Sequence, residues 1–179
     1  SATAISNLVS NSGVIASDVS GVGTAKTDLA AAGYGTDKAI FGFGKTSGNV
    51  STTNLVSNSG VVATDVTGVG TARRQLDAAS YGTDKAIFAY GYVSAVSSLK
   101  NLVSNSGVVA SDVSGVGTAR YGLAAAGYGS DKAVFAYGNS GSAVSLKNLV
   151  NNEGLVAADV TGVGTARYAL AAAGFSTSA

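Results

Sequence analysis

The sequence contains no proline, cysteine, methionine, tryptophan or histidine among its 179 residues. Without cysteine it can form no disulfide, thiolate metal site or cysteine nucleophile. Without histidine it lacks the commonest general base and the commonest metal ligand. These absences remove most of the side chains from which catalytic and metal sites are built. We therefore expect a protein that is not an enzyme and that uses no cofactor or metal ion.

Charged residues are scarce, at 12% of the chain, and the formal net charge is +1. So small a charge creates no field that would attract nucleic acid or an anionic membrane surface. No apolar run approaches the roughly 18 to 20 residues that cross a bilayer. We therefore expect neither nucleic-acid binding nor membrane insertion. A surface of Ser, Thr and Asn favours an exposed extracellular or particle surface over a cytosolic enzyme.

What the chain does contain is one unit repeated every 47 residues. The tripeptide Asn-Leu-Val begins at Asn7, Asn54, Asn101 and Asn148. A period of roughly 40 to 50 residues is typical of propeller blades and of helical pairs. We divide the single domain 1–179 into a first part with only outer strands, three complete units, and a last part with only an innermost strand: 1–23, 24–70, 71–117, 118–164 and 165–179.

Each complete unit predicts two β-hairpins. In the third unit, residues 123–128 and 133–137 flank a turn rich in Gly, Ser and Asp, which indicates a hairpin. Residues 145–150 and 155–160 flank a second turn of Asn and Gly. Four short strands in 47 residues have the size and content of one propeller blade.

A helix is the alternative for residues 165–174, because Thr165 could cap an Ala-rich segment that ends at Gly174. The earlier copies argue against it. Gln75 and Asp77 stand where the first copy has Asp28 and Ala30, so polar replacements fall two residues apart. That spacing is one face of a strand, and we predict a strand here.

The unit resembles the kelch-type blade. Residues 120–127 give a basic residue and a small-residue inner strand, residues 132–138 end a second strand in Tyr-Gly, and Asn148 begins the outer strands. The resemblance covers nearly the whole chain, although kelch units usually end the second strand in Gly-Gly and carry a Trp in the fourth. It implies an all-β protein, a β-propeller of four four-stranded kelch-like blades.

Two sequence motifs of the unit also resemble kelch-like repeats of predicted phage structural proteins from marine sources: Leu-Val-Ser-Asn-Ser-Gly-Val-Val-Ala and Gly-Val-Gly-Thr-Ala-Arg. This second resemblance implies a structural protein of a phage virion, in the capsid, neck or tail. Its expected partners are other protein subunits, either copies of itself or virion proteins. A carbohydrate-binding, lectin-like propeller with a glycan as its partner is the alternative.

The ring would lack one strand. Four complete units need 188 residues, four times 47, and the chain has nine fewer. The segment without a counterpart corresponds to residues 133–141, the second strand of a blade. The chain could belong to a longer one, two chains could form a larger ring, or a partner could supply a strand. We therefore expect an incomplete ring or one completed in an oligomer.

Three sets of residues are candidates for binding. The first set has one basic residue at the start of each inner strand: Lys26, Arg73, Arg120 and Arg167. Together they could form an axial ring that binds an anion, or each could pair with the aspartate of a nearby loop. Tyr34, Tyr81 and Tyr128 could form an aromatic shelf for sugars or bases, or could pack in the core. The third set lies in the one loop that varies between copies, where recognition usually occurs: Lys45, Asn49, Tyr92 and Asn139.

The aspartates that precede each Val-Ser/Thr-Gly-Val-Gly loop faintly resemble calcium ligands, at Asp18, Asp65, Asp112 and Asp159. Calcium takes six to eight oxygens, and one carboxylate with one hydroxyl supplies too few. We expect these side chains to accept backbone hydrogen bonds in a tight turn instead.

Overall fold

The computed structural model describes residues 2–174, and within them every regular element is a β-strand. The strands form three separate antiparallel sheets, in the orders β1-β2-β3, β4-β5-β6 and β7-β8-β9. The all-β prediction is confirmed, and the helical alternative for residues 165–174 is wrong. No helix that could cross a membrane occurs in the described part of the chain. The strand bounds are β1 Ala30–Tyr34, β2 Lys38–Gly42, β3 Thr53–Val56, β4 Asp77–Tyr81, β5 Lys85–Ala89, β6 Lys100–Val103, β7 Ala124–Tyr128, β8 Lys132–Ala136 and β9 Lys147–Val150.

The first hairpin of each unit forms as predicted. β1 pairs with β2 from Ala30 opposite Gly42 to Tyr34 opposite Lys38. The chain reverses through Gly35 and Thr36, whose φ angles are 58° and 68°. Positive φ at successive turn residues matches the twist of the two strands, and glycine adopts it at no steric cost. Turn chemistry therefore fixes this hairpin locally.

The second hairpin differs from the prediction, because its outer strand is reduced to isolated bridges. In the first unit Thr53 pairs with Val66 and Val56 pairs with Val62. Two residues separate these bridges on the inner side and three separate them on the outer side. One extra residue makes a β-bulge, which interrupts the ladder of hydrogen bonds. The same offset recurs in the other complete units, so each sheet has three regular strands rather than four.

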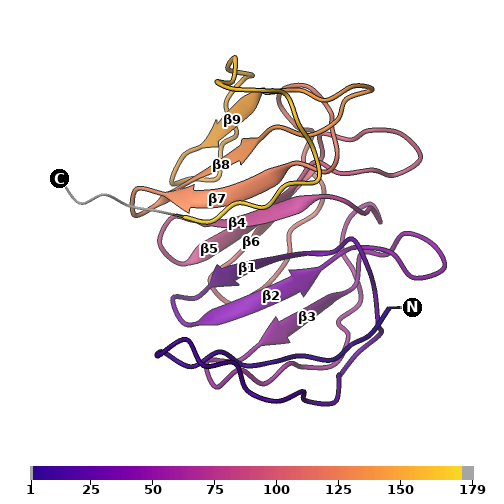
Figure 1. Ribbon diagram of the computed structural model, residues 1–179, viewed down its shortest axis with the longest axis vertical. Coiled ribbons are helices and arrows are strands. Elements are labelled where there is room, and N and C mark those ends of the chain that lie inside the picture. The colour runs from indigo at the N-terminus through magenta and orange to yellow at the C-terminus, as the bar shows by residue number, and fades with distance from the viewer. Residues whose placement is uncertain (1, 175–179) are drawn as a thin grey trace.

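The sheets stack through their inner strands. Figure 1 shows β1, β4 and β7 side by side in the middle of the molecule, with β3 and β9 at opposite ends. Small side chains permit the close approach, and the Ser80 hydroxyl donates to the Gly33 carbonyl at 2.9 Å. The described residues form an open stack and not a closed ring.

A ladder of backbone hydrogen bonds joins equivalent positions of successive units. Gln75 N–H donates to the Asp28 carbonyl at 2.9 Å, and Gly122 N–H donates to the Gln75 carbonyl at 2.9 Å. Ala169 N–H then donates to the Gly122 carbonyl at 2.8 Å. These positions all have φ between 53° and 59°. Every unit therefore meets the next in the same geometry.

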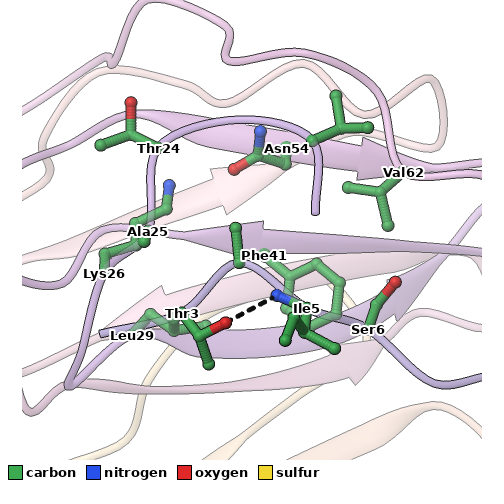
Figure 2. Close-up of a pocket in the computed structure, with 12 residues that line it drawn as sticks. Thr3, Ile5, Ser6, Thr24, Ala25, Lys26, Leu29, Phe41, Asn54 and Val62 are labelled. Atoms are coloured by element: carbon green, nitrogen blue, oxygen red, sulfur yellow. Dashed lines mark hydrogen bonds between the residues drawn. The ribbon is translucent and has the colours of Figure 1, made fainter. Parts of the chain in front are cut away.

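The two incomplete parts lie at opposite ends of the stack (Figure 1). At the N-terminal end, Ser6 pairs with Val19 and Val9 with Ile15, which gives the predicted outer pair as bridges. This segment and the first sheet line a pocket of about 140 Å³ (Figure 2). At the other end, residues 165–174 follow the third sheet without forming a regular strand. An innermost strand needs a neighbour equivalent to β8, and no described residue supplies one for 165–174.

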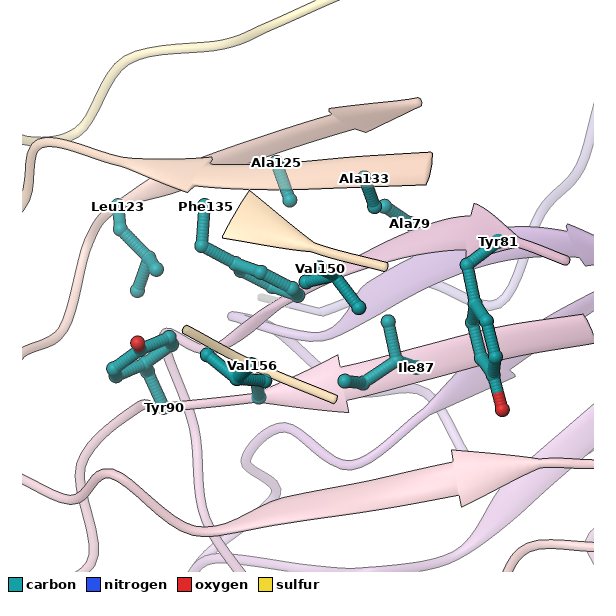
Figure 3. Close-up of a cluster of buried hydrophobic side chains, with 11 residues drawn as sticks. Ala79, Tyr81, Ile87, Tyr90, Leu123, Ala125, Ala133, Phe135, Val150 and Val156 are labelled. Carbon is teal, nitrogen blue, oxygen red and sulfur yellow. The ribbon is translucent and has the colours of Figure 1, made fainter. Parts of the chain in front are cut away.

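Two apolar clusters fill the spaces between sheets. Phe43 and Phe88 centre the first cluster, between the first and second sheets. Tyr90 and Phe135 centre the second (Figure 3). Each fully buried side chain of this size contributes roughly 1.5 to 3 kcal/mol. Leu76, Phe88, Leu123 and Phe135 are buried between the sheets, while their first-unit counterparts Leu29 and Phe41 line the pocket at the N-terminal end.

Candidate functional site

A hydrogen-bonded group of four residues, which we call the clasp, ties the start of the second and third complete units to their ends. In the second unit, Asp112 Oδ2 accepts from the backbone N–H and the hydroxyl of Thr71, at 2.8 and 2.6 Å. Its Oδ1 accepts from Asn101 Nδ2 at 2.9 Å. Arg73 Nη2 donates to Asn101 Oδ1 at 2.7 Å. The third unit repeats the clasp with Thr118, Arg120, Asn148 and Asp159.

Arg73 is fully buried, and its N–H groups are used inside the protein. Nε donates to the Tyr90 carbonyl at 2.9 Å and Nη1 to the Thr71 carbonyl at 3.2 Å. Its guanidinium carbon lies 4.3 Å from the centre of the Phe43 ring. Burial lowers the pKa of Arg73 to about 10, although the Asp112 carboxylate, 3.8 Å from Nη1, raises it. The side chain is therefore a buried cation at neutral pH.

Of the four basic residues considered as an axial ring, three are buried, and all four donate hydrogen bonds within the protein. Arg73 and Arg120 are fully buried, and Lys26 is nearly so, with Nζ donating to the Thr52 carbonyl and hydroxyl at 3.1 and 3.2 Å. Arg167 Nη1 donates to the Thr165 carbonyl at 3.1 Å. Since these N–H groups already have partners, the alternative of pairing with aspartate describes the two buried arginines better.

The predicted aromatic shelf is also buried. Tyr34 is 5% exposed and Tyr81 is 3% exposed. A methyl group on Gly107 would lie 2.9 Å from Tyr34 Cζ, and one on Gly154 equally close to Tyr81 Cζ. Each ring therefore packs against the glycine turn of the next unit, so its faces are not available to a sugar. Tyr128 is half-buried, and Phe175, its counterpart in the last copy, lies outside the described residues.

The loop aspartates act in the clasp rather than as an array of free ligands. Burial would raise the pKa of Asp112 and of Asp159, but hydrogen bonds from threonine and asparagine outweigh it and lower both. Hydrogen bonds from Thr24 and Asn54 lower the pKa of Asp65. Within residues 2–174 no three acidic side chains come together as a metal site would require.

The variable loops come together in a row along one edge of the stack, which we call the loop row: residues 45–49, 92–96 and 139–143. Asn49 Nδ2 donates to the Tyr92 and Val93 carbonyls at 3.2 and 2.9 Å. Arg74 Nη1 donates to Asn49 Oδ1 at 2.9 Å, and its guanidinium carbon lies 4.9 Å from the centre of the Tyr92 ring. The Tyr121 ring lies 5.6 Å from that of Tyr92, edge to face.

The predicted recognition residues occupy the bases of these loops. Bridges pair Lys45 with Asn49, Tyr92 with Val96 and Asn139 with Ala143, and the named side chains are half-buried. The exposed tips are small and polar instead: Ser47, Gly48, Ser94, Ala95, Gly141 and Ser142. A rigid base with a small tip presents backbone groups and short side chains to a partner.

Sequence reasoning overlooked the pocket at the N-terminal end. Its lining includes Ile5, Lys26, Leu29 and Phe41. The signal that could have revealed it is the inter-unit pattern itself. Phe41 and Leu29 repeat positions that are buried in later units, and the outer-strand segment 2–23 leaves both lining the pocket.

Comparison with known proteins identifies no relative. No model of a known protein family matches the chain, and a search of curated proteins finds no match.

Proposed function

We propose that the chain is a non-enzymatic structural module that attaches to other protein surfaces through the loop row. The observation that carries this proposal is the contrast between loops and scaffold. The clasp repeats with the same contacts in the second and third units, whereas the loops beside it differ in sequence. Variation on a constant scaffold is where recognition usually lies.

The repetition of polar groups supports a structural role. Catalysis needs one asymmetric set of groups, whereas structural roles recur once per repeat. Asp112 and Asp159 make the same contacts in successive units, as do Arg73 and Arg120. Arg73 and Arg120 are fully buried, and the hydrogen bonds of all four residues tie the start of a unit to its end.

In its finer form the proposal is a propeller of four kelch-like blades in a phage virion, with a ring that is incomplete in one chain or completed in an oligomer, and with the fourth strand of each blade reduced to bridges. Inner strands of small residues, and second strands that run into Phe-Gly or Tyr-Gly, are the features that support kelch-like blades. The virion location rests on the resemblance of the repeat's sequence motifs to those of predicted phage structural proteins. Assembly into a capsid, neck or tail would use protein surfaces of the kind the loop row offers.

Immunogold labelling of particles from the natural source, viewed in negative stain, tests the location. Gold on a defined part of the virion is the expected result, and particles without label would refute it. Binding of the purified chain to the same particles tests the site. Tyr92→Ala should weaken that binding at least tenfold, because it removes a ring at the base of the loop row. Lys132→Ala, in a hairpin turn at the other end of the strands, is the matched control.

A glycan array distinguishes the lectin alternative from protein attachment. Saturable glycan binding that disappears in Tyr92→Ala would replace the protein-attachment proposal with carbohydrate recognition. Because Tyr34 and Tyr81 are buried, binding that depended on either would require the units to separate.

A further inference from the structure

The pocket at the N-terminal end corresponds to a space that an aromatic ring fills between complete units. Between the first and second sheets, Phe43 packs 5.2 Å from the ring of Phe88 and 4.3 Å from the guanidinium carbon of Arg73. The counterparts of Phe88 and Arg73, 47 residues earlier, are Phe41 and Lys26. Both line the pocket (Figure 2).

The next interface repeats this arrangement. Tyr90 packs 5.6 Å from the ring of Phe135 and 4.2 Å from the guanidinium carbon of Arg120. Two independent interfaces of the same chain thus place an aromatic side chain between a phenylalanine and a basic residue. The pocket presents that phenylalanine and that basic residue without the ring between them.

Backbone groups beside the pocket are also placed for a partner. In complete units the aromatic N–H donates across the sheet, from Phe43 to the Thr52 carbonyl at 3.1 Å. The following glycine, Gly44, donates to the Arg73 carbonyl at 2.9 Å. The corresponding acceptors at the pocket are the carbonyls of Ile5 and Lys26. Neither accepts a hydrogen bond from any residue that the structure describes.

An unpaired strand edge continues the pocket. In the first sheet, Asn54 and Val56 pair with β2. Their counterparts Asn7 and Val9 have outer neighbours, since Val9 forms a bridge with Ile15. On the inner side, the backbone groups of Asn7 and Val9 bond to no described residue. Large apolar side chains along this edge are exposed, Ile5 to 50% and Val9 to 64%.

We propose that this edge and pocket form a docking groove for a β-strand that ends in an aromatic residue followed by glycine, supplied by a protein partner. The proposal deepens the proposed attachment function, on which it rests, by naming the chemistry of one partner segment. The strand adds to the edge at Ser6–Val9 by β-augmentation. Its aromatic ring enters between Phe41 and Lys26, and its glycine N–H donates to the Lys26 carbonyl.

The complete units also specify which aromatic residue and which following residue fit best. Tyr90 donates its hydroxyl to the Val116 carbonyl at 3.1 Å, and Val22 is the counterpart of Val116 at the pocket. A tyrosine strand therefore gains a hydrogen bond that a phenylalanine strand lacks. Glycine is favoured next, because the residues that follow the aromatic ring in complete units, Gly44 and Gly91, have φ of 103° and 108°, where other residues are strained.

Fluorescence anisotropy with a labelled Lys-Ala-Ile-Phe-Ala-Tyr-Gly peptide, the sequence of residues 85–91, tests the groove on the full chain. Saturable binding is expected. Replacing the peptide's Tyr with Phe should weaken binding about two- to tenfold, the loss of one hydrogen bond. Replacing it with Ala, or the Gly with Ala, should weaken binding at least tenfold. Absence of saturable binding, or equal affinity of all four peptides, would overturn the proposal.

Two variants of the chain locate the binding. Ile5→Lys places a charge in the groove and should abolish peptide binding. Ile15→Lys is the control, because Ile15 is 68% exposed and does not line the pocket. Equal loss in both variants would refute the location. Tyr92→Ala should bind the peptide normally. Loss of particle binding in Tyr92→Ala therefore reports on the loop row, and loss of peptide binding in Ile5→Lys reports on the groove.

Discussion

Replacing Arg73 with lysine should strongly destabilise the protein although the charge is kept. Arg73 donates three hydrogen bonds, to the carbonyls of Tyr90 and Thr71 and to Asn101 Oδ1. One ammonium group at the end of a flexible chain cannot reach the three acceptors that the planar guanidinium serves. In the first unit Lys26 is held by the backbone and hydroxyl of Thr52, but the residue at the equivalent position in the second unit, Leu99, has no hydroxyl.

The size of the effect follows from the acceptors left unpaired. A buried acceptor without a partner costs about 1 to 3 kcal/mol, and lysine leaves at least two. Loss of the guanidinium stacked on Phe43 adds about 0.5 to 2 kcal/mol. We expect the free energy of unfolding to fall by about 3 to 5 kcal/mol. For a chain of this length each kcal/mol corresponds to about 2 to 4 °C in Tm, so Tm should fall by at least about 6 °C.

Urea unfolding followed by circular dichroism, together with calorimetry, measures the change. The reverse exchange, Lys26→Arg, is the matched control, because Lys26 borders the pocket at the end of the stack. It should change the free energy of unfolding by less than about 1 kcal/mol. If Arg73→Lys were as mild as Lys26→Arg, the clasp would not depend on guanidinium geometry and the reasoning would be refuted.

Three further predictions concern single groups. The pKa of Asp112 is lower in the folded protein than its ordinary value of 3.8. The stability that Asp112 contributes is therefore present above about pH 4 and is lost as pH falls from there through the folded pKa, so Asp112→Asn should flatten the fall of the urea midpoint below about pH 4. Gly91→Ala should lower the free energy of unfolding by at least about 2 kcal/mol, because φ is 108° and the new methyl group would lie 2.8 Å from the Arg74 carbonyl oxygen. Gly48→Ala is the control: open space surrounds Gly48, so the free energy of unfolding should fall by less than about 0.5 kcal/mol. Ser80→Ala removes the hydroxyl that bonds to the preceding inner strand and should lower thermal stability by about 0.5 to 1.5 kcal/mol; no change would show that side chains do not help to join the sheets.

The features that sequence predicted well are local ones. The hairpin at Gly35 and Thr36 depends on turn residues that lie next to one another, and the inner-strand positions depend on a spacing of two. The reduced outer strand was missed because the extra residue between Val62 and Val66 is visible only against its partner, Thr53–Val56. The sequence of one strand alone does not reveal a bulge, because a bulge is a difference in length between two paired strands.

The binding residues were harder to predict because their burial depends on contacts between units. Arg73 looks like a surface cation until the Phe43 ring of the preceding unit covers it. Tyr81 looks like part of an exposed shelf until Gly154 of the next unit packs on it. The sequence places the loop residues in equivalent loops of successive units, but it does not show that Arg74 and Tyr121 link these loops.

The backbone ladder between units has a consequence for how such a chain can change over generations. Its rungs use only main-chain atoms, and the residues at that position are Asp28, Gln75, Gly122 and Ala169. Side-chain identity there is limited mainly by the positive φ angle, which disfavours β-branched residues. A duplication or deletion of 47 residues would regenerate the same rung at the new junction, so unequal recombination could lengthen or shorten the stack in one step while leaving each surviving interface intact.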